Sequence, residues 1–343
     1  MTDAAEACVN RLRDRAATSD AREAVETALH DRLQPMIVRV TGRAGVGKSP
    51  IVSVLDSVQL DADGLDVRIH EGRTDSSAGE VLVHVVAGAV SPVDTAFLSS
   101  RPRGALDGTV VVLTKADTLD DPSAAAATAS EQLGRTVLPV MGSIAAGLRG
   151  VGGTGATVDM ADVRAVAAAD LRPADMMTVD RFRAADIAVS PRRREALIEC
   201  VELRGLALLV DVVRRHSAIS DSDAMRVLAD ATGVDAMITA VATAVSSAAA
   251  SRDGELHTAL QQISAGHRQV RSAVESYLAS DEAVAAEMRC AAVRLRVSIE
   301  TGSERDVVEQ VALWQQRAAA SGSSDERRSA LALCRGYVRI LHR

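Results

Sequence analysis

Residues 36–50, with the sequence MIVRVTGRAGVGKSP, constrain the fold of this chain more than any other segment. An apolar, β-branched run comes first, a glycine-rich loop follows, and a helical pattern then extends from residue 49 to 58. The loop matches G-x-x-x-x-G-K-[ST], in which backbone amides surround a diphosphate, the lysine reaches the outer phosphates and the hydroxyl binds Mg²⁺. An incidental turn is the alternative. The sequence predicts a phosphate-binding loop formed by Gly42, Gly45, Val46, Gly47, Lys48 and Ser49.

Alternating strand and helix patterns continue through residues 36–149 and predict a parallel sheet covered by helices. The expected strands are 36–40, 66–70, 81–87, 109–114 and 136–140, and the later helices of this region are 92–99 and 122–133. From about residue 159 the patterns are almost entirely helical, with helices expected at 194–216, 222–232, 235–250, 256–279, 281–300, 304–320 and 324–342. The expected fold is therefore α/β over 36–150, with an N-terminal helical segment, 1–35, and an all-α domain, 151–343.

The composition narrows the classes of function. A net charge of −7 gives no general support for nucleic-acid binding, and aromatic residues are too scarce to form base-stacking platforms. The cysteines are scattered without metal or redox spacing, so we expect small buried side chains in a reducing compartment at Cys8, Cys200, Cys290 and Cys334. The N-terminus lacks an apolar signal core, and no run approaches the ~18 apolar residues of a membrane span. A cytoplasmic protein is expected.

A second motif, Thr114-Lys115-Ala116-Asp117, follows the apolar strand at 109–114 and matches [NT]-K-x-D. Its aspartate can accept hydrogen bonds from guanine N1–H and N2–H, whereas adenine presents the wrong pattern. A four-letter match is weak alone, but this motif lies two strands downstream of the predicted phosphate-binding loop. After the next strand, a backbone amide would contact guanine O6. The sequence thus predicts guanine binding by Thr114, Lys115, Asp117, Gly142 and Ser143.

These three elements resemble the P-loop GTPases of the translation-factor class, over residues 36–149. The helical segments on both sides, and the sequence VELRGLALLV that begins at Val201, are similar to actinobacterial dynamin-like GTPases. The resemblance implies GTP or GDP as ligand and Mg²⁺ as cofactor, with Ser49 as a metal ligand. The match after the last strand rests on position, because Met141-Gly142 replaces the usual Ser-Ala.

Several positions depart from the pattern of an active GTPase. No threonine lies between Ser49 and Asp66 to serve the first switch, and this segment is too short for a switch loop and the usual second strand. The strand at 66–70 ends in HEGR where D-x-x-G is expected, and a formal D-x-x-G at 61–64 precedes that strand. Glu71 is a candidate acid for the Mg²⁺ site and Thr74 a candidate displaced switch threonine. Both also fit an ordinary surface loop.

We expect a guanine-nucleotide-binding protein whose degenerate G domain switches or stabilises a helical, partner-binding domain, with weak or absent hydrolysis. Two alternatives remain open. An active dynamin-like GTPase acting at membranes is disfavoured by the missing switch residues, and a nucleotide-free scaffold is disfavoured by the intact Lys48, Ser49 and Asp117. The expected partners are a guanine nucleotide and a protein, with a homodimer open. The basic amphipathic tail, 330–343, fits a helix packed on the bundle, which we favour, or contact with a membrane surface or a partner.

Overall fold

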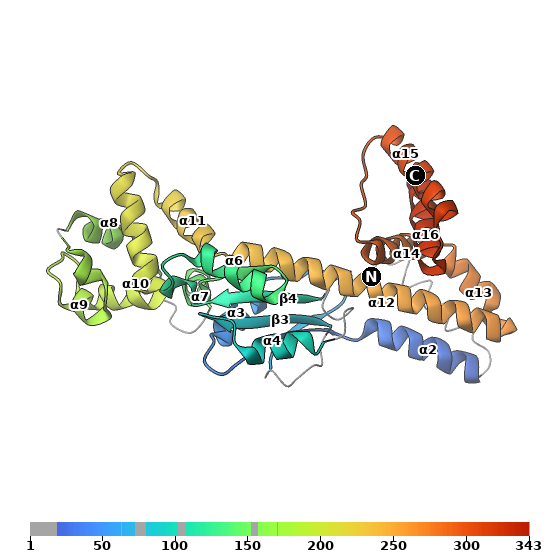
Figure 1. The fold of residues 1–343 in the computed structure, drawn as a ribbon, viewed down its shortest axis with the longest axis horizontal. Coiled ribbons are helices and arrows are strands. Elements are labelled where there is room, and N and C mark those ends of the chain that lie inside the picture. Colours follow the sequence, from blue (N-terminus) through green and yellow to red (C-terminus); the bar gives the residue numbers. More distant parts are fainter. Residues whose placement is uncertain are drawn as a thin grey trace. The chain divides into compact units, whose positions relative to one another are not determined.

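The computed structural model describes residues 19–62, 64–72, 80–101, 108–151, 157–169 and 171–342. It shows an α/β protein rich in helices (Figure 1). Contacts divide the described residues into two compact units. The sheet unit holds those of Ile37–Leu60 and Val67–Ala244, and the helical unit holds those of Met1–Met36, Asp61–Asp66 and Val245–Arg343. This division differs from the expected boundary near residue 150, because the helices up to residue 244 share a unit with the sheet.

Parallel strands form the sheet in the order β2-β1-β3-β4-β5, and all of the expected strands are confirmed. At the β2 edge, the Met36 N–H donates to the Asp66 carbonyl oxygen (2.7 Å) and the Gly72 N–H donates to the Val40 carbonyl oxygen (2.8 Å). This staggered pair shows that β2 runs in the same direction as β1. The strands are β1 (Met36–Gly42), β2 (Val67–Glu71), β3 (Val81–Ala87), β4 (Thr109–Thr114) and β5 (Val137–Pro139).

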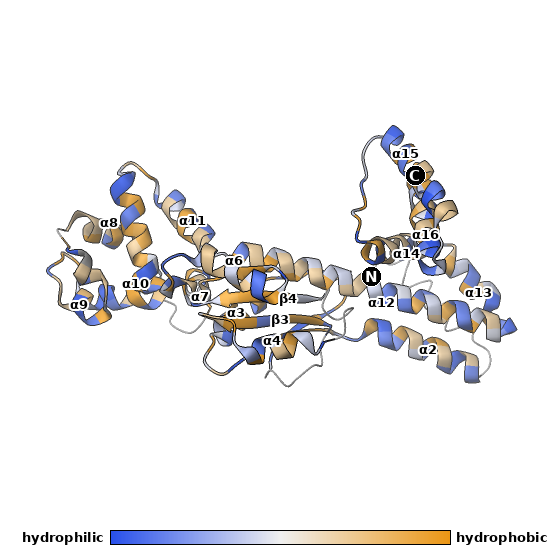
Figure 2. Cartoon of the chain, viewed as in Figure 1, coloured by the Kyte–Doolittle hydropathy of each residue, from blue (hydrophilic) through white to orange (hydrophobic). Residues whose placement is uncertain are grey.

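Helices on the connections between strands cover the sheet. Those between strands are α3 (Lys48–Asp56), α4 (Pro92–Ser99) and α6 (Pro122–Leu133), and α7 (Gly142–Leu148) follows the last strand, β5. β3 is buried along nearly its whole length, as expected for a strand covered on both faces, and Figure 2 shows it mostly orange. Side-chain caps set two of the helix starts. The Ser91 hydroxyl accepts from the Asp94 N–H, and the Asp121 carboxylate accepts from the Ala124 N–H.

The sheet unit also contains a helical part, made of α8 (Met160–Ala168), η2 (Pro173–Met176), α9 (Val179–Ala184), α10 (Pro191–Arg215) and α11 (Asp221–Ala231). Together with α7 these elements share one core, in which Phe182, Leu197 and Leu206 are buried. Arg194 lies buried in the same region, where its guanidinium donates to the carbonyl oxygens of Val189 (2.8 Å) and Ile187 (2.9 Å). Peptide dipoles therefore compensate the buried charge.

The helical unit is formed by α2 (Ser19–Leu33), the later part of α12 (Val234–Gly266), α13 (Arg268–Leu278), α14 (Asp281–Leu295), α15 (Glu304–Ala320) and α16 (Ser324–Leu341). One apolar cluster joins α2, α12 and α13 around Val25, Leu260 and Val274. Another joins α14, α15 and α16 around Trp314 and Tyr337. The tail helix α16 therefore buries one face within this unit.

Helix α12 corrects one expectation. The sequence predicted separate helices at 235–250 and 256–279, whereas α12 continues unbroken from Val234 to Gly266 and α13 follows it. Gly254 allows close packing instead of ending a helix, because a Cβ there would lie 2.2 Å from Cys290 Sγ. Its neighbour Asp253 forms ion pairs with Arg32 (2.5 Å) and Arg289 (3.2 Å). The glycine and its charged neighbours therefore lie where α12 packs closely against α14, and they do not end a helix.

By length and composition, α12 is also able to span a membrane, with a mean hydropathy of 1.4 over its most apolar window. It is the one helix of this kind among the residues that the structure describes. The expectation that no segment approaches a membrane span is corrected to that extent. Core helices of other proteins meet the same criterion, and Val241, Val245 and Ala249 of α12 are fully buried.

Candidate functional site

The glycine-rich loop, residues 42–49, leaves the carboxyl end of β1 and enters α3. β1 lies between β2 and β3. The connection that follows β1 therefore leads to a strand on one side of it, and the connection that follows β2 leads to a strand on the other side. Such a reversal opens a crevice outside the carboxyl ends of the strands, where open α/β sheets bind ligands. Gly42 has a φ of 149°, and a Cβ on it would lie 2.4 Å from the Val85 carbonyl oxygen, so the turn requires glycine. The loop occupies the expected ligand position of the sheet.

The last two residues of the loop meet an acid from β2. The Lys48 ammonium donates to the Arg43 carbonyl oxygen (3.0 Å) and lies 3.6 Å from Glu71 Oε1. The Ser49 hydroxyl donates to Glu71 Oε2 (3.0 Å). The Glu71 side chain is 43% exposed, whereas that of Lys48 is 11% exposed. The structure thus brings together Lys48, Ser49 and Glu71, which the sequence predicted for phosphate and metal binding.

Thr114 connects the two sequence motifs. This buried residue ends β4, and its hydroxyl lies within hydrogen-bonding distance of the Val46 carbonyl oxygen in the glycine-rich loop and of the Val86 carbonyl oxygen (3.0 Å). A Cβ added to Gly47 would lie 3.6 Å from Thr114 Oγ1. The first residue of the second motif therefore holds the glycine-rich loop directly.

The other residues predicted for base binding follow β4 and β5. Lys115 is exposed, with a left-handed backbone (φ 57°), and Asp117 is half-buried in the short helix η1 (Ala116–Thr118). Gly142 begins α7 and packs closely on α3, because a Cβ on it would lie 3.1 Å from Ile51 Cδ1. Ser143 beside it is exposed. Since β1, β3, β4 and β5 are parallel, all these residues lie at one edge of the sheet.

Glu202 joins this site, although no sequence pattern singles it out. It interrupts α10 with a non-helical backbone (φ 53°, ψ 175°). Its carboxylate lies near the Ser143 hydroxyl and close enough to Asp117 for their charges to interact. Burial, and then the charge of Asp117, raise the pKa of Glu202, whereas the Ser143 hydroxyl opposes the rise. A second carboxylate therefore faces the predicted base-binding residues.

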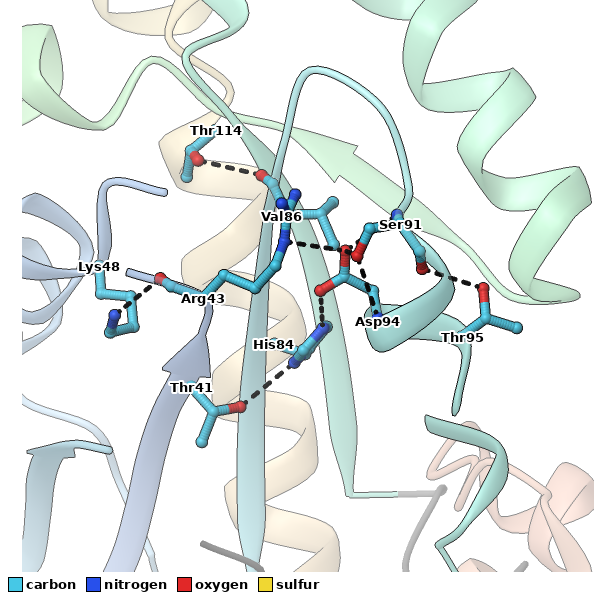
Figure 3. Close-up of polar contacts among 9 residues, drawn as sticks. All are labelled: Thr41, Arg43, Lys48, His84, Val86, Ser91, Asp94, Thr95 and Thr114. Atoms are coloured by element: carbon cyan, nitrogen blue, oxygen red, sulfur yellow. Dashed lines mark hydrogen bonds and ion pairs between the residues drawn. The ribbon is translucent and has the colours of Figure 1, made fainter. Parts of the chain in front are cut away.

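A buried polar network also contacts the glycine-rich loop (Figure 3). In β3, His84 Nε2 lies 3.1 Å from Asp94 Oδ1, and His84 Nδ1 lies 3.3 Å from Thr41 Oγ1. Asp94 Oδ2 accepts from the Ser91 N–H (3.0 Å) and the Ser91 hydroxyl (2.6 Å), and it lies 3.5 Å from Arg43 Nε. Through Arg43, the network ties the loop to the first turn of α4.

The protonation of this network follows from its burial. Burial lowers the pKa of His84, and the charges of Arg101 and Arg135 act in the same direction, although Asp94 opposes them. A neutral ring that donates Nε2–H to the carboxylate accepts the Thr41 hydroxyl proton at Nδ1. Thr41, His84 and Asp94 are fully buried, so they support the loop and offer no group to a substrate. In the sequence, the feature that could have indicated this network is a histidine within an apolar strand.

Some predicted residues lie elsewhere. Cys8 and Thr74 are outside the described residues. The other cysteines agree with the prediction of buried side chains, and burial raises the pKa of each thiol: Cys200, Cys290 and Cys334.

A cavity of about 180 Å³ lies in the helical unit, between α12, α14 and α16. Glu287 in its wall accepts from Arg335 (2.8 Å) and lies 3.5 Å from His257 Nε2. The residues of the two motifs do not line this cavity. We therefore place the candidate site at the sheet edge, where the motif residues converge.

Among the residues that the structure describes, no group of three or more histidine, cysteine or acidic side chains is arranged to hold a metal ion. Comparisons with known protein families, curated proteins and solved structures found no match to this chain. The geometry of the site is therefore the basis for assigning its function.

Proposed function

We propose that this chain is a guanine-nucleotide-binding protein with a P-loop GTPase-like sheet domain. GDP or GTP, with Mg²⁺, binds at the carboxyl edge of the sheet and stabilises the adjoining helices, which bind a protein partner. Residues 42–49 bind the phosphates, and the base is bound by Thr114, Lys115, Asp117, Gly142 and Ser143. Hydrolysis is weak or absent. The location we propose is the cytoplasm.

The observation that carries this proposal is the contact of Thr114 with the glycine-rich loop. A phosphate-loop pattern or a T-K-x-D pattern alone arises easily by chance. Two such patterns, which follow β1 and β4 at the carboxyl edge of one parallel sheet and are joined by a buried hydroxyl, form a single site. That arrangement is what one ligand with phosphates at one end and a base at the other requires.

The distribution of lysine supports the same conclusion. Of the 39 lysine and arginine residues, only Lys48 and Lys115 are lysines, and both lie in the motifs. Everywhere else the chain uses arginine, whose planar guanidinium is larger and less flexible than an ammonium. A compact ammonium suits the phosphates, and a narrow aliphatic stem suits packing across a base. Lysine is thus retained at the two positions where its shape is needed.

Ser49 and Glu71 fit a Mg²⁺ ion. Octahedral Mg²⁺ holds its ligands at about 2.0–2.1 Å, so adjacent ligand oxygens lie about 2.9–3.0 Å apart. The Ser49 Oγ to Glu71 Oε2 distance is 3.0 Å. These two residues would hold the ion together with nucleotide phosphates and water, and the ion would neutralise phosphate charge.

Two other functions are less well supported. An active dynamin-like GTPase needs a first switch, but the chain passes from α3 to β2 without another strand in the described residues. A nucleotide-free scaffold would have no need to keep both lysines and Asp117 at one edge of the sheet.

The test measures nucleotide binding to the full chain by isothermal titration in Mg²⁺ buffer. We expect GDP and GTP to bind and ADP and ATP to bind at least about tenfold more weakly, because Asp117 matches only guanine. Lys48→Ala should lose at least about a hundredfold in affinity, since several charge-assisted hydrogen bonds disappear together. Arg192→Ala, which removes an exposed cation from the same unit, serves as the control.

Amine-specific labelling gives a second readout. Because the chain has two lysines, mass spectrometry can follow each one separately. Bound GDP should protect both Lys48 and Lys115, whereas inorganic phosphate should protect Lys48 alone. Equal affinity for GDP and ADP, or no protection of either lysine, would contradict the proposed function.

A further inference from the structure

The structure places Glu202 of α10 beside the residues assigned to the base. We propose that Glu202 is a specificity-determining residue, a second carboxylate that accepts a hydrogen bond from the 2-amino group of guanine alongside Asp117. This inference rests on the proposed guanine-nucleotide site. It adds a contribution from the helical part of the sheet unit, which the motifs do not include.

Two glycine contacts hold Glu202 in place. A Cβ on Gly147 of α7 would lie 1.9 Å from the carbonyl oxygen of Cys200, and a Cβ on Gly205 of α10 would lie 3.3 Å from Ile144 of α7. Cys200 and Gly205 stand on either side of Glu202 in the sequence. α10 is therefore in close contact with α7 on both sides of Glu202, and α7 is the helix that begins with Gly142 and Ser143.

The backbone at Glu202 is strained. Its φ of 53° and ψ of 175° interrupt α10 in a region that is almost restricted to glycine. Non-glycine residues keep such conformations only where the surrounding contacts enforce them, and these positions cluster at functional sites. Here the strain accompanies a carboxylate that lies near Ser143 and Asp117, on the helix that packs closely against α7.

The chemistry of guanine explains why two carboxylates would stand together. Facing carboxylates repel each other unless hydrogen-bond donors lie between them. The guanine edge carries one N1–H and two N2–H donors. Asp117 can accept N1–H and one N2–H, which leaves one N2–H for Glu202. Hypoxanthine lacks the 2-amino group, so it would leave Glu202 without this partner.

The experiment compares the affinities of GDP and inosine diphosphate by isothermal titration. In the wild-type chain GDP should bind more tightly. Glu202→Gln should reduce the ratio of the two affinities by about tenfold, because a hydrogen bond to a charged acceptor is replaced by a neutral one. The matched control is Glu199→Gln, which neutralises an exposed carboxylate on the same helix and should leave the ratio unchanged.

A second variant covers the chance that Glu202→Gln folds poorly. Glu202→Gly removes the carboxylate and suits the observed backbone conformation, so it should fold and show the same reduced ratio. An unchanged ratio in the Glu202 variants would overturn the inference. So would equal tightening of both nucleotides, which would mean that Glu202 occludes the site. If the titration shows that the wild-type chain binds no guanine nucleotide, the proposed function itself is wrong. This result is distinct from an unchanged ratio in the Glu202 variants, which would contradict only the role of Glu202.

Discussion

Asp117 is the residue that we propose to read the base of the bound nucleotide. It is half-buried at the carboxyl end of β4, in a short helix that follows the left-handed Lys115. Burial raises the pKa of Glu202, and the nearby charge of Asp117 adds to this rise. A carboxylate in this setting favours a ligand with N–H donors, and guanine provides them on the edge that it presents.

Exchanging this carboxylate for an amide should change the preferred base. We expect Asp117→Asn to weaken GDP binding by at least about tenfold and to favour xanthosine diphosphate, whose C2 carbonyl can accept from the new N–H₂. Titration with both nucleotides checks this. The control is Asp120→Asn, which alters an exposed carboxylate nearby. A preference for GDP that survives in Asp117→Asn would mean that another group reads the base.

Among the single residues of the candidate site, the sequence predicted those that belong to contiguous motifs. Lys48, Ser49 and Asp117 could be placed because a loop or strand end sets their spacing. Glu202 could not be predicted, because its position depends on how α10 crosses α7. His84 was not predicted either. A histidine in an apolar strand indicates a buried partner, but Asp94 becomes that partner only through the capped first turn of α4.

Among the elements, the contact between α7 and α10 connects the sheet to the helices of its own unit. Gly147 allows the Cys200 carbonyl oxygen to approach α7, and Cys200 lies two residues before the strained Glu202. A change in this contact would therefore alter both the stability of the unit and the position of Glu202.

We expect Gly147→Ala to destabilise the protein by about 1–3 kcal/mol, because the added methyl group would overlap a backbone oxygen that cannot move freely. Alanine favours a helix by up to ~1 kcal/mol, which offsets only part of this cost. Thermal melting measures the effect. Gly266→Ala is the matched control, since nothing lies within 4 Å of its added Cβ. A Gly147→Ala protein that melts at a higher temperature than the wild type would show that α7 and α10 can move apart without loss of folding free energy, and would contradict this prediction.

The strands could be predicted from the sequence because each is a short apolar run that ends in a loop signal. Helix ends were harder to predict. The sequence predicted a break between residues 250 and 256, where Gly254 lies, and only the neighbouring α14 shows that this glycine makes room for Cys290 Sγ. Pro191 at the start of α10 extended that helix beyond its apolar pattern. Tertiary packing decides such cases, and a single sequence does not contain it.

At the scale of the whole molecule, the proposed nucleotide site combines residues suited to holding phosphates with few residues suited to sensing the γ-phosphate. We propose that the loop, Lys48 and Ser49 hold the phosphates, and Glu71 is the acid that contacts both Lys48 and Ser49. A protein that binds two ligands equally cannot be switched between states by exchanging them. We therefore expect bound nucleotide to stabilise the protein as a permanent component.

Hydrolysis is the property in which this chain should differ most from an active GTPase. Phosphoryl transfer depends on positioning the attacking water and stabilising charge, and the residues that do so are the ones missing here. GDP and GTP should bind with affinities within about threefold of each other, well under the tenfold that 1.4 kcal/mol represents. Single-turnover cleavage of GTP by the full chain should not exceed that of Lys48→Ala. Adding a partner protein could restore cleavage by supplying an arginine. Robust cleavage by the chain alone, lost in Lys48→Ala, would contradict the prediction and favour an active dynamin-like GTPase.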